Sequence, residues 1–111
     1  MTCLLTRRNA LALGAAAVLA RPALAAVKRP VIVELFTSQG CSSCPPADKL
    51  LGELAQDSSL VALSLSIDYW DYLGGKDTLA DARFSARQKA YSRARGDRNV
   101  HTPQGVVNGS M

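Results

Sequence analysis

The spacing of apolar residues along the chain predicts a strand, a helix and a second strand, in that order. Residues 31–36, VIVELF, are apolar on both faces of a strand except at Glu34, which is typical of a central parallel strand covered on each side. Residues 46–56 carry apolar side chains at helical spacing, and residues 60–67, LVALSLSI, return to a strand pattern. This order is a βαβ unit, and its crossover should be right-handed.

A second helix is predicted in the last third of the chain. Thr78 and Asp81 have the spacing of a capping box, and Gly96 stands where a helix of about four turns would end. The predicted core-facing stripe of this helix consists of Leu79, Ala82, Ala86 and Ala90. A short strand, GVV, follows, and the dipeptide Asn108-Gly109 after it is a strong signal for a hairpin turn.

Two cysteines, Cys41 and Cys44, lie three residues apart between the first strand and the first helix. Pro45 or Pro46 fits the first turn of that helix, so both sulfurs should lie at its N-terminus. There, unpaired backbone N–H groups and the positive end of the helix macrodipole stabilise a thiolate, the form of cysteine that attacks a disulfide. The spacing also permits the Cα separation of roughly 5.5 Å that a disulfide needs. We therefore predict a redox-active pair, with Cys41 as the nucleophile and Cys44 as the resolving thiol.

Other uses of the cysteine pair differ in the ligands they require. A structural zinc site needs four ligands, and apart from the N-terminal segment the chain offers only Cys41, Cys44 and His101. A covalently bound haem needs a histidine where Pro45 stands, and a purely structural disulfide would close a tiny loop and add little stability. The alternative that stays open is a Cu(I)-binding or metallochaperone module, for which Cys41, Cys44 and His101 suffice. The direction of the His101 ring distinguishes it from the redox function, which requires no cofactor.

The first 25 residues have the pattern of an export signal. Arg7 and Arg8 form a charged start, and residues 10–20 are apolar but shorter than the about 20 residues that span a bilayer. The arginine pair resembles a twin-arginine signal, and residues 23–25, ALA, fit a cleavage site. We expect a mature chain that begins near residue 26, in the periplasm or outside the cell, without a stable membrane anchor.

Cleavage of that signal would change the composition that matters for function. The signal contains three of the 13 Lys and Arg residues and no acid, so the formal net charge falls from +4 to +1. Cys3 leaves with it, and Cys41 and Cys44 can then pair only with each other or with a partner molecule. The chain has no nucleic-acid motif, and the small remaining charge does not favour such a partner. Residues 26–30 form a tether, and residues 31–111 form the domain.

The order of strand, CxxC, helix, strand, helix, X-Pro and strand resembles the thioredoxin-like fold. The segments VIVELFTSQGCSSCPPADKLLGELA, DYWDYLGGKD and HTPQGVVNG are similar to a family of secreted, thioredoxin-like proteins of unknown function. The resemblance implies an α/β fold with a βαβ-α-β core and partners that are exported proteins carrying thiols or disulfides. It also implies a cis bond between Thr102 and Pro103, packed against the cysteines, and pairing of the Thr102 backbone with an extended substrate.

Two segments carry acidic residues whose role has to be weighed. Glu34 occupies a place similar to the buried acid of thioredoxins, though one residue further from the first cysteine, and could exchange protons with Cys44. Alternatively, Glu34 lies at an exposed strand edge or pairs with a basic side chain. Residues 68–72, DYWDY, are expected to serve packing and capping rather than to form a ligand site.

The resemblance also predicts that the domain is incomplete at its C-terminus. A thioredoxin-like sheet continues through the hairpin into a further strand and a closing helix, which would follow the turn at Asn108-Gly109. We therefore expect a truncated core that lacks this final strand and helix, with the GVV strand as a sheet edge. The alternative is a minimal domain that covers this edge by dimerisation.

Overall fold

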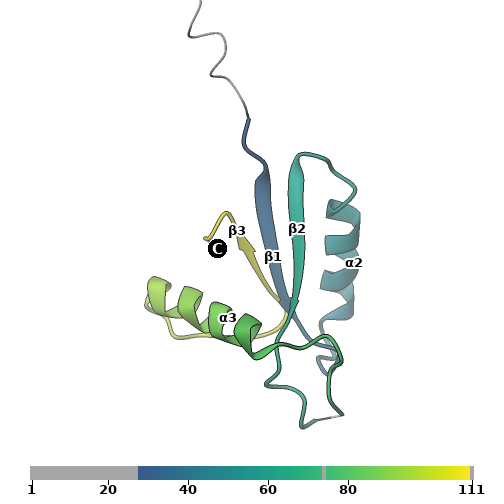
Figure 1. Ribbon diagram of the computed structural model, residues 1–111, viewed down its shortest axis with the longest axis vertical. Helices are drawn as coiled ribbons and strands as arrows, with labels where there is room; N and C mark the ends of the chain where they lie inside the picture. Colours follow the sequence, from purple (N-terminus) through teal and green to yellow (C-terminus); the bar gives the residue numbers. More distant parts are fainter. Residues whose placement is uncertain (1–27, 74, 111) are drawn as a thin grey trace, which may run out of the picture.

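The computed structural model describes residues 28–73 and 75–110, which form a small α/β fold (Figure 1). Its elements are β1 (Val31–Thr37), α2 (Pro45–Leu54), β2 (Leu60–Ser66), α3 (Ala82–Arg95) and β3 (Gln104–Val107). The predicted export signal, Cys3 and the start of the tether lie outside the described residues. Neither α2 nor α3 has the length and apolar character needed to cross a membrane.

The three strands form a mixed sheet in the order β2-β1-β3. β1 is parallel to β2 and antiparallel to β3, and within this register Val33 pairs with both Ala62 and Val107. The central position of β1 confirms the prediction made from its apolar pattern. The order of the elements is compatible with a thioredoxin-like βαβ-α-β core.

The two helices cover opposite faces of the sheet, with α2 on one side and α3 crossing the other (Figure 1). Because side chains alternate along a strand, neighbouring residues of β1 contact different helices. Val33 and Leu35 line an apolar groove together with Leu51 of α2, whereas Glu34 bonds to side chains of α3. This alternation decides which residues of β1 can take part in a site near α2.

The hydrophobic core lies on the α3 side of the sheet. Phe36, Ile67 and Val106 are each at most 1% exposed and form one cluster. Tyr91 of α3 packs on it, with its ring edge-on to Phe36 at a centroid distance of 6.2 Å. Residues of β1, β3 and α3 therefore meet in the core, which fixes the ends of the strands from which the loops around the cysteines emerge.

The start of α3 differs from the predicted capping box, whereas its end does not. Asp81 is itself the N-cap, and its side chain accepts a hydrogen bond of 2.8 Å from the backbone N–H of Arg83. Side-chain and backbone hydrogen bonds from Arg83 lower the pKa of Asp81 to about 2. Thr78 lies before the helix, so the box is wrong, while Gly96 ends the helix in a left-handed conformation as predicted.

The predicted core-facing stripe of α3 is also wrong. Leu79 is 68% exposed and precedes the helix, and the three alanines of the stripe are exposed. The helix instead buries Ser85, Gln88 and Ser92. Buried polar groups are tolerated where they are hydrogen-bonded, and the structure gives Ser85 and Gln88 such partners. The helix therefore packs through polar contacts that an apolar pattern does not reveal.

The hairpin turn at Asn108-Gly109 is present as predicted. Both residues have positive φ, 49° and 76°, which the favoured two-residue hairpin turns require. Val107 and Ser110 exchange backbone hydrogen bonds of 2.8 and 3.0 Å across the turn. The chain therefore reverses direction directly after β3.

Candidate redox site

A disulfide joins Cys41 and Cys44 at the N-terminus of α2, with a Cα separation of 5.4 Å. Cys44 is the N-cap of the helix, and Pro45 and Pro46 occupy its first two positions. Proline has no N–H, so among the first three helical residues only Ala47 carries a backbone donor. The number of donors that can stabilise a thiolate is therefore smaller than the sequence argument assumed, and the helix macrodipole provides the remaining stabilisation.

The segment before Cys41 is a tight turn that brings Gly40 close to the backbone of Trp70. The backbone N–H of Cys41 donates to the carbonyl of Ser38 at 3.2 Å, and that of Gly40 donates to the Ser38 hydroxyl at 3.1 Å. A Cβ on Gly40 would lie 3.2 Å from the carbonyl oxygen of Trp70, which is tighter than ordinary contact. The missing side chain therefore lets the backbone at Trp70 approach the cysteine turn.

The two sulfurs differ in access. Cys44 is completely buried, whereas Cys41 is 9% exposed and lines a cleft of about 260 Å³. The other residues that line this cleft are Gly40, Ser42, Ser43, Trp70, Leu73 and Thr102. Cys41 is therefore the cysteine of the pair that borders a cleft, which agrees with its predicted role as the one that an attacking thiolate reaches.

The peptide bond between Thr102 and Pro103 is cis, which confirms the prediction drawn from the resemblance. Thr102 lines the same cleft as Cys41, and its hydroxyl accepts a hydrogen bond of 2.8 Å from the indole N–H of Trp70. Pro103 lines the apolar groove on the α2 side. The turn before β3 therefore lies at the cysteine site, whereas pairing of the Thr102 backbone with a substrate stays a prediction.

Asp77 fixes the long loop between β2 and α3 against the cysteine turn. This carboxylate is 2% exposed and accepts hydrogen bonds of 2.8 Å from the backbone N–H groups of Gln39 and Leu79. The N–H of Asp77 in turn donates to the side chain of Asp71 at 3.1 Å. The loop that carries Trp70 is thus anchored two residues before Cys41.

Gln88 of α3 connects three segments near the site through its side chain: the loop after β2, the segment before Thr102, and β3. Its side-chain oxygen accepts a hydrogen bond of 2.8 Å from the Tyr69 hydroxyl, and its amide nitrogen donates to the His101 carbonyl at 2.8 Å and to the Gln104 side chain at 2.7 Å. Burial raises the pKa of Tyr69, although its hydrogen bond to Gln88 acts in the opposite direction. Tyr69 therefore stays protonated and acts as the donor.

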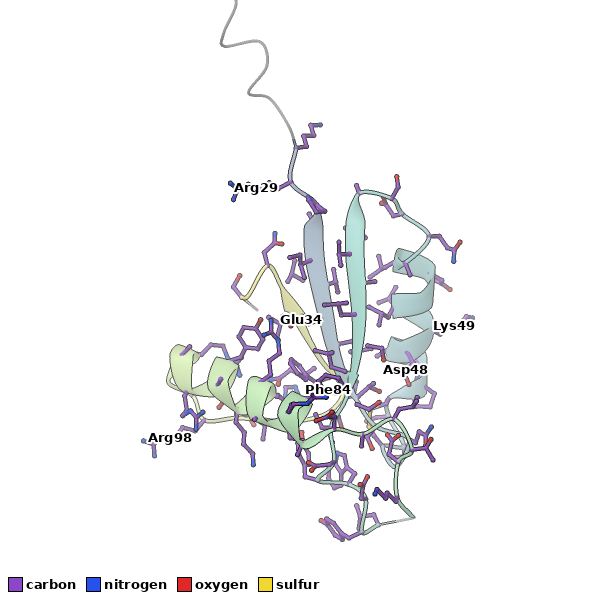
Figure 2. The ribbon with its side chains drawn as sticks, in the orientation of Figure 1. Arg29, Glu34, Asp48, Lys49, Phe84 and Arg98 are labelled. Carbon is purple, nitrogen blue, oxygen red and sulfur yellow. A yellow bond between two sulfur atoms is a disulfide. The ribbon has the colours of Figure 1, made fainter. Side chains whose placement is uncertain are left out.

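Glu34 pairs with basic and phenolic groups of α3, which is one of the alternatives that its sequence position left open. It is 2% exposed and accepts hydrogen bonds from the Arg87 guanidinium and the Tyr91 hydroxyl. The hydrogen bond to Glu34 raises the pKa of Arg87, and burial, followed by the bond to Glu34, raises that of Tyr91. Figure 2 shows Glu34 on the α3 side of the sheet, away from Asp48 on α2. The hydrogen bonds of Glu34 thus lie on the face of the sheet opposite to α2 and Cys44.

His101 does not complete a metal site. His101 is exposed, and only its backbone carbonyl takes part in the network around Gln88. Within residues 28–73 and 75–110, no three His, Cys, Asp or Glu side chains are placed to hold a metal ion together. The ligand set that the Cu(I) alternative requires, Cys41, Cys44 and His101, is therefore not assembled in this conformation.

A comparison with known protein families shows to which family the chain belongs. Residues 32–111 match the model of a family described as Protein of unknown function (DUF1223). The chain belongs to this family. The chain is also similar to a protein of known crystal structure from Agrobacterium tumefaciens, with 49% sequence identity and a TM-score of 0.69. That match covers 75% of this chain and 38% of the Agrobacterium chain, so the chain spans well under two thirds of the length of that protein.

No curated protein is detectably similar to this member of the DUF1223 family. The family description assigns no reaction, so function has to be argued from the site. Sequence reasoning found both cysteines and the Thr102-Pro103 bond. Trp70 packs against the core, as expected for residues 68–72, and it also lines the cleft of Cys41. Its place beside the cysteines has no local sequence signal, because it depends on a hydrogen bond to Thr102, 32 positions later.

Proposed function

We propose that the protein is an exported thiol-disulfide oxidoreductase-like member of the thioredoxin-like superfamily. The observation that carries the proposal is the Cys41–Cys44 disulfide at a helix N-terminus, with Cys44 buried and Cys41 open to a cleft. A structural disulfide gains nothing from a cleft at one of its sulfurs, whereas an exchange reaction needs one reachable sulfur and one protected sulfur. The fold and the cis bond at Thr102-Pro103 agree with the same proposal.

In the oxidised state, the proposed reaction begins with the thiolate of a partner cysteine. It attacks Sγ of Cys41, the Cys41–Cys44 bond breaks, and its electron pair leaves on Cys44, which takes up a proton. A second partner thiolate then attacks the partner sulfur of this mixed disulfide and releases Cys41. The partner is oxidised by two electrons and the cysteine pair is reduced. In the reverse direction, Cys41 attacks a partner disulfide and Cys44 releases the reduced partner.

The trapping of mixed disulfides tests this mechanism. Cys44→Ser removes the resolving thiol, so mixed disulfides between Cys41 and exported proteins are expected to accumulate on non-reducing gels. Cys41→Ser is expected to trap none, because the remaining Cys44 is completely buried. Equal trapping by the two variants, or none by either, would remove the mechanism.

Export of the chain is tested separately. The segment of residues 1–25 supports it through its charged start, its apolar stretch and its small residues at 23–25. Expressed with its own N-terminus in a bacterium, the protein is expected in the periplasmic or extracellular fraction with a new N-terminus near residue 26. Arg7→Lys combined with Arg8→Lys is expected to abolish export by the twin-arginine route and to leave an uncleaved precursor. If the protein without these substitutions stays uncleaved in the cytoplasm, export is contradicted.

A further inference from the structure

The cleft beside Cys41 has the size of a side-chain pocket. Its volume of about 260 Å³ lies below the roughly 300–1,000 Å³ of pockets that enclose drug-sized molecules. The residues that line it are uncharged, and they include two large apolar side chains, Trp70 and Leu73, together with the hydroxyl-bearing residues Ser42, Ser43 and Thr102. Such a lining suits an uncharged, flat side chain better than an anion or a cation.

The rim of the cleft exposes apolar surface. Leu73, which lines the cleft, is 57% exposed, and its neighbour Tyr72 is 78% exposed. Large apolar side chains that gather beside a reactive group mark a contact surface more often than isolated ones do. A partner that covers Leu73 while its cysteine reaches Cys41 would remove this surface from water.

The walls of the cleft are held in place without a ligand. Trp70 donates its indole N–H to Thr102, and its carbonyl accepts the N–H of Leu73 at 3.0 Å. The approach to Gly40 and the bonds of Asp77 fix the same loop from the other side. A pocket that is formed before binding costs little ordering when a partner enters.

The backbone of Thr102 offers a place for an extended partner. No residue in the described part of the chain hydrogen-bonds to its N–H or its carbonyl, and Thr102 borders the cleft that Cys41 opens into. In an extended chain, side chains two positions apart point to the same face and lie about 7 Å from each other. A partner whose cysteine faces Cys41 thus presents the residue two positions away to the same cleft.

We propose that the cleft of Cys41, Trp70, Leu73 and Thr102 is a specificity pocket for an aromatic side chain two positions from the exchanging cysteine of an extended polypeptide. The pocket deepens the proposed oxidoreductase function, on which it rests, by naming the class of substrate. Trp70 and Leu73 contact the aromatic ring, and the uncharged lining offers no partner for an ionised side chain.

Binding without exchange tests the pocket by itself. Short synthetic peptides carry serine in place of the exchanging cysteine and either phenylalanine or serine two positions away. They are titrated into the full chain, and the emission of Trp70, the single tryptophan, is recorded. The phenylalanine peptide is expected to bind roughly tenfold more tightly, which corresponds to partial burial of one aromatic side chain.

Two leucines of similar exposure supply the variant and its control. Leu73→Ser is expected to abolish the preference for phenylalanine, whereas Leu50→Ser should leave it unchanged, because Leu50 is 55% exposed on α2 and outside the cleft. Loss of the preference in both variants, or in neither, overturns the pocket.

A second measurement separates the pocket from the reaction. Cysteine-containing versions of the two peptides react with the oxidised full chain, and the rate of mixed-disulfide formation is compared. A faster rate with phenylalanine supports both proposals. Binding that depends on Leu73 without any exchange supports the pocket and removes the reaction. Exchange at equal rates with both peptides overturns the pocket and leaves the reaction intact.

Discussion

Replacing Gln88 with leucine is expected to cost about 3 kcal/mol of the free energy of unfolding. Leucine has a similar size but removes three hydrogen bonds, each with a net value of roughly 0.5–1.5 kcal/mol. The Tyr69 hydroxyl and the His101 carbonyl lose the partner that the structure gives them. Because small domains are stable by only about 5–15 kcal/mol, this loss is a large share of the total. Urea denaturation followed by circular dichroism measures it.

The neighbouring Lys89 supplies the control for this experiment. Lys89 is exposed on the same helix, so Lys89→Leu changes surface polarity at nearly constant helix propensity and does not touch the network. It is expected to leave the urea midpoint nearly unchanged. A small effect of Gln88→Leu, comparable to that of Lys89→Leu, would show that the network contributes little. The emission of Trp70 should shift only in the Gln88 variant. Gln88 bonds to Tyr69 and His101, and these residues directly precede Trp70 and Thr102, which form the indole hydrogen bond.

Arg87→Met is expected to lower the free energy of unfolding by about 2 kcal/mol. Removing one partner of a fully buried ion pair costs roughly 3–5 kcal/mol, because the remaining charge stays buried. Glu34 is 2% exposed, but the Arg87 side chain is 54% exposed and already partly screened by water, so the lower figure applies. Glu34→Gln added to Arg87→Met should recover part of the loss, since it removes the unpaired charge.

Arg83 provides a matched control on the same helix. Its ion pair with Asp81 is exposed, with 86% of the Arg83 side chain accessible, so Arg83→Met should have little effect. Glu34→Gln alone also separates the two roles considered for this residue. If Glu34 is structural, the pH dependence of disulfide exchange stays that of the unaltered protein while stability falls. A shifted pH profile at unchanged stability would instead assign Glu34 to proton exchange with Cys44.

The parts of the fold that depend on local pattern could be predicted from the sequence. The apolar run of β1, the helical spacing in α2 and the hairpin dipeptide each act over a few residues, and all three elements are present. The packing of α3 could not be predicted in this way. Its buried side chains are polar, and the groups that satisfy them come from the loop after β2 and from the segment around β3. A pattern of apolar residues carries no information about such partners.

The candidate site also has parts that follow from local sequence and parts that depend on distant contacts. The cysteine pair and the Thr102-Pro103 bond follow from short motifs and the resemblance, and both are where they were expected. The position of Trp70 depends on a hydrogen bond to a residue 32 positions later, and that of Asp77 on one to Gln39, 38 positions earlier. For Glu34, the sequence left the face of the sheet undecided. One step along a strand exchanges the two faces, and the hydrogen bonds to Arg87 and Tyr91 show that Glu34 faces α3.

The disulfide joins two residues that are close in the sequence, whereas the cleft beside it is formed by residues that are far apart in the sequence. Cys41 and Cys44 are neighbours in any conformation of the chain, because only three positions separate them. The cleft wall instead joins the cysteine turn to residues 70 and 102, and β1 meets β3 across a pairing of Val33 with Val107. Contacts between distant segments form after local ones, since a long loop must first be closed. A newly made chain can therefore form the Cys41–Cys44 disulfide before the cleft beside it, which we propose selects the partner, has formed.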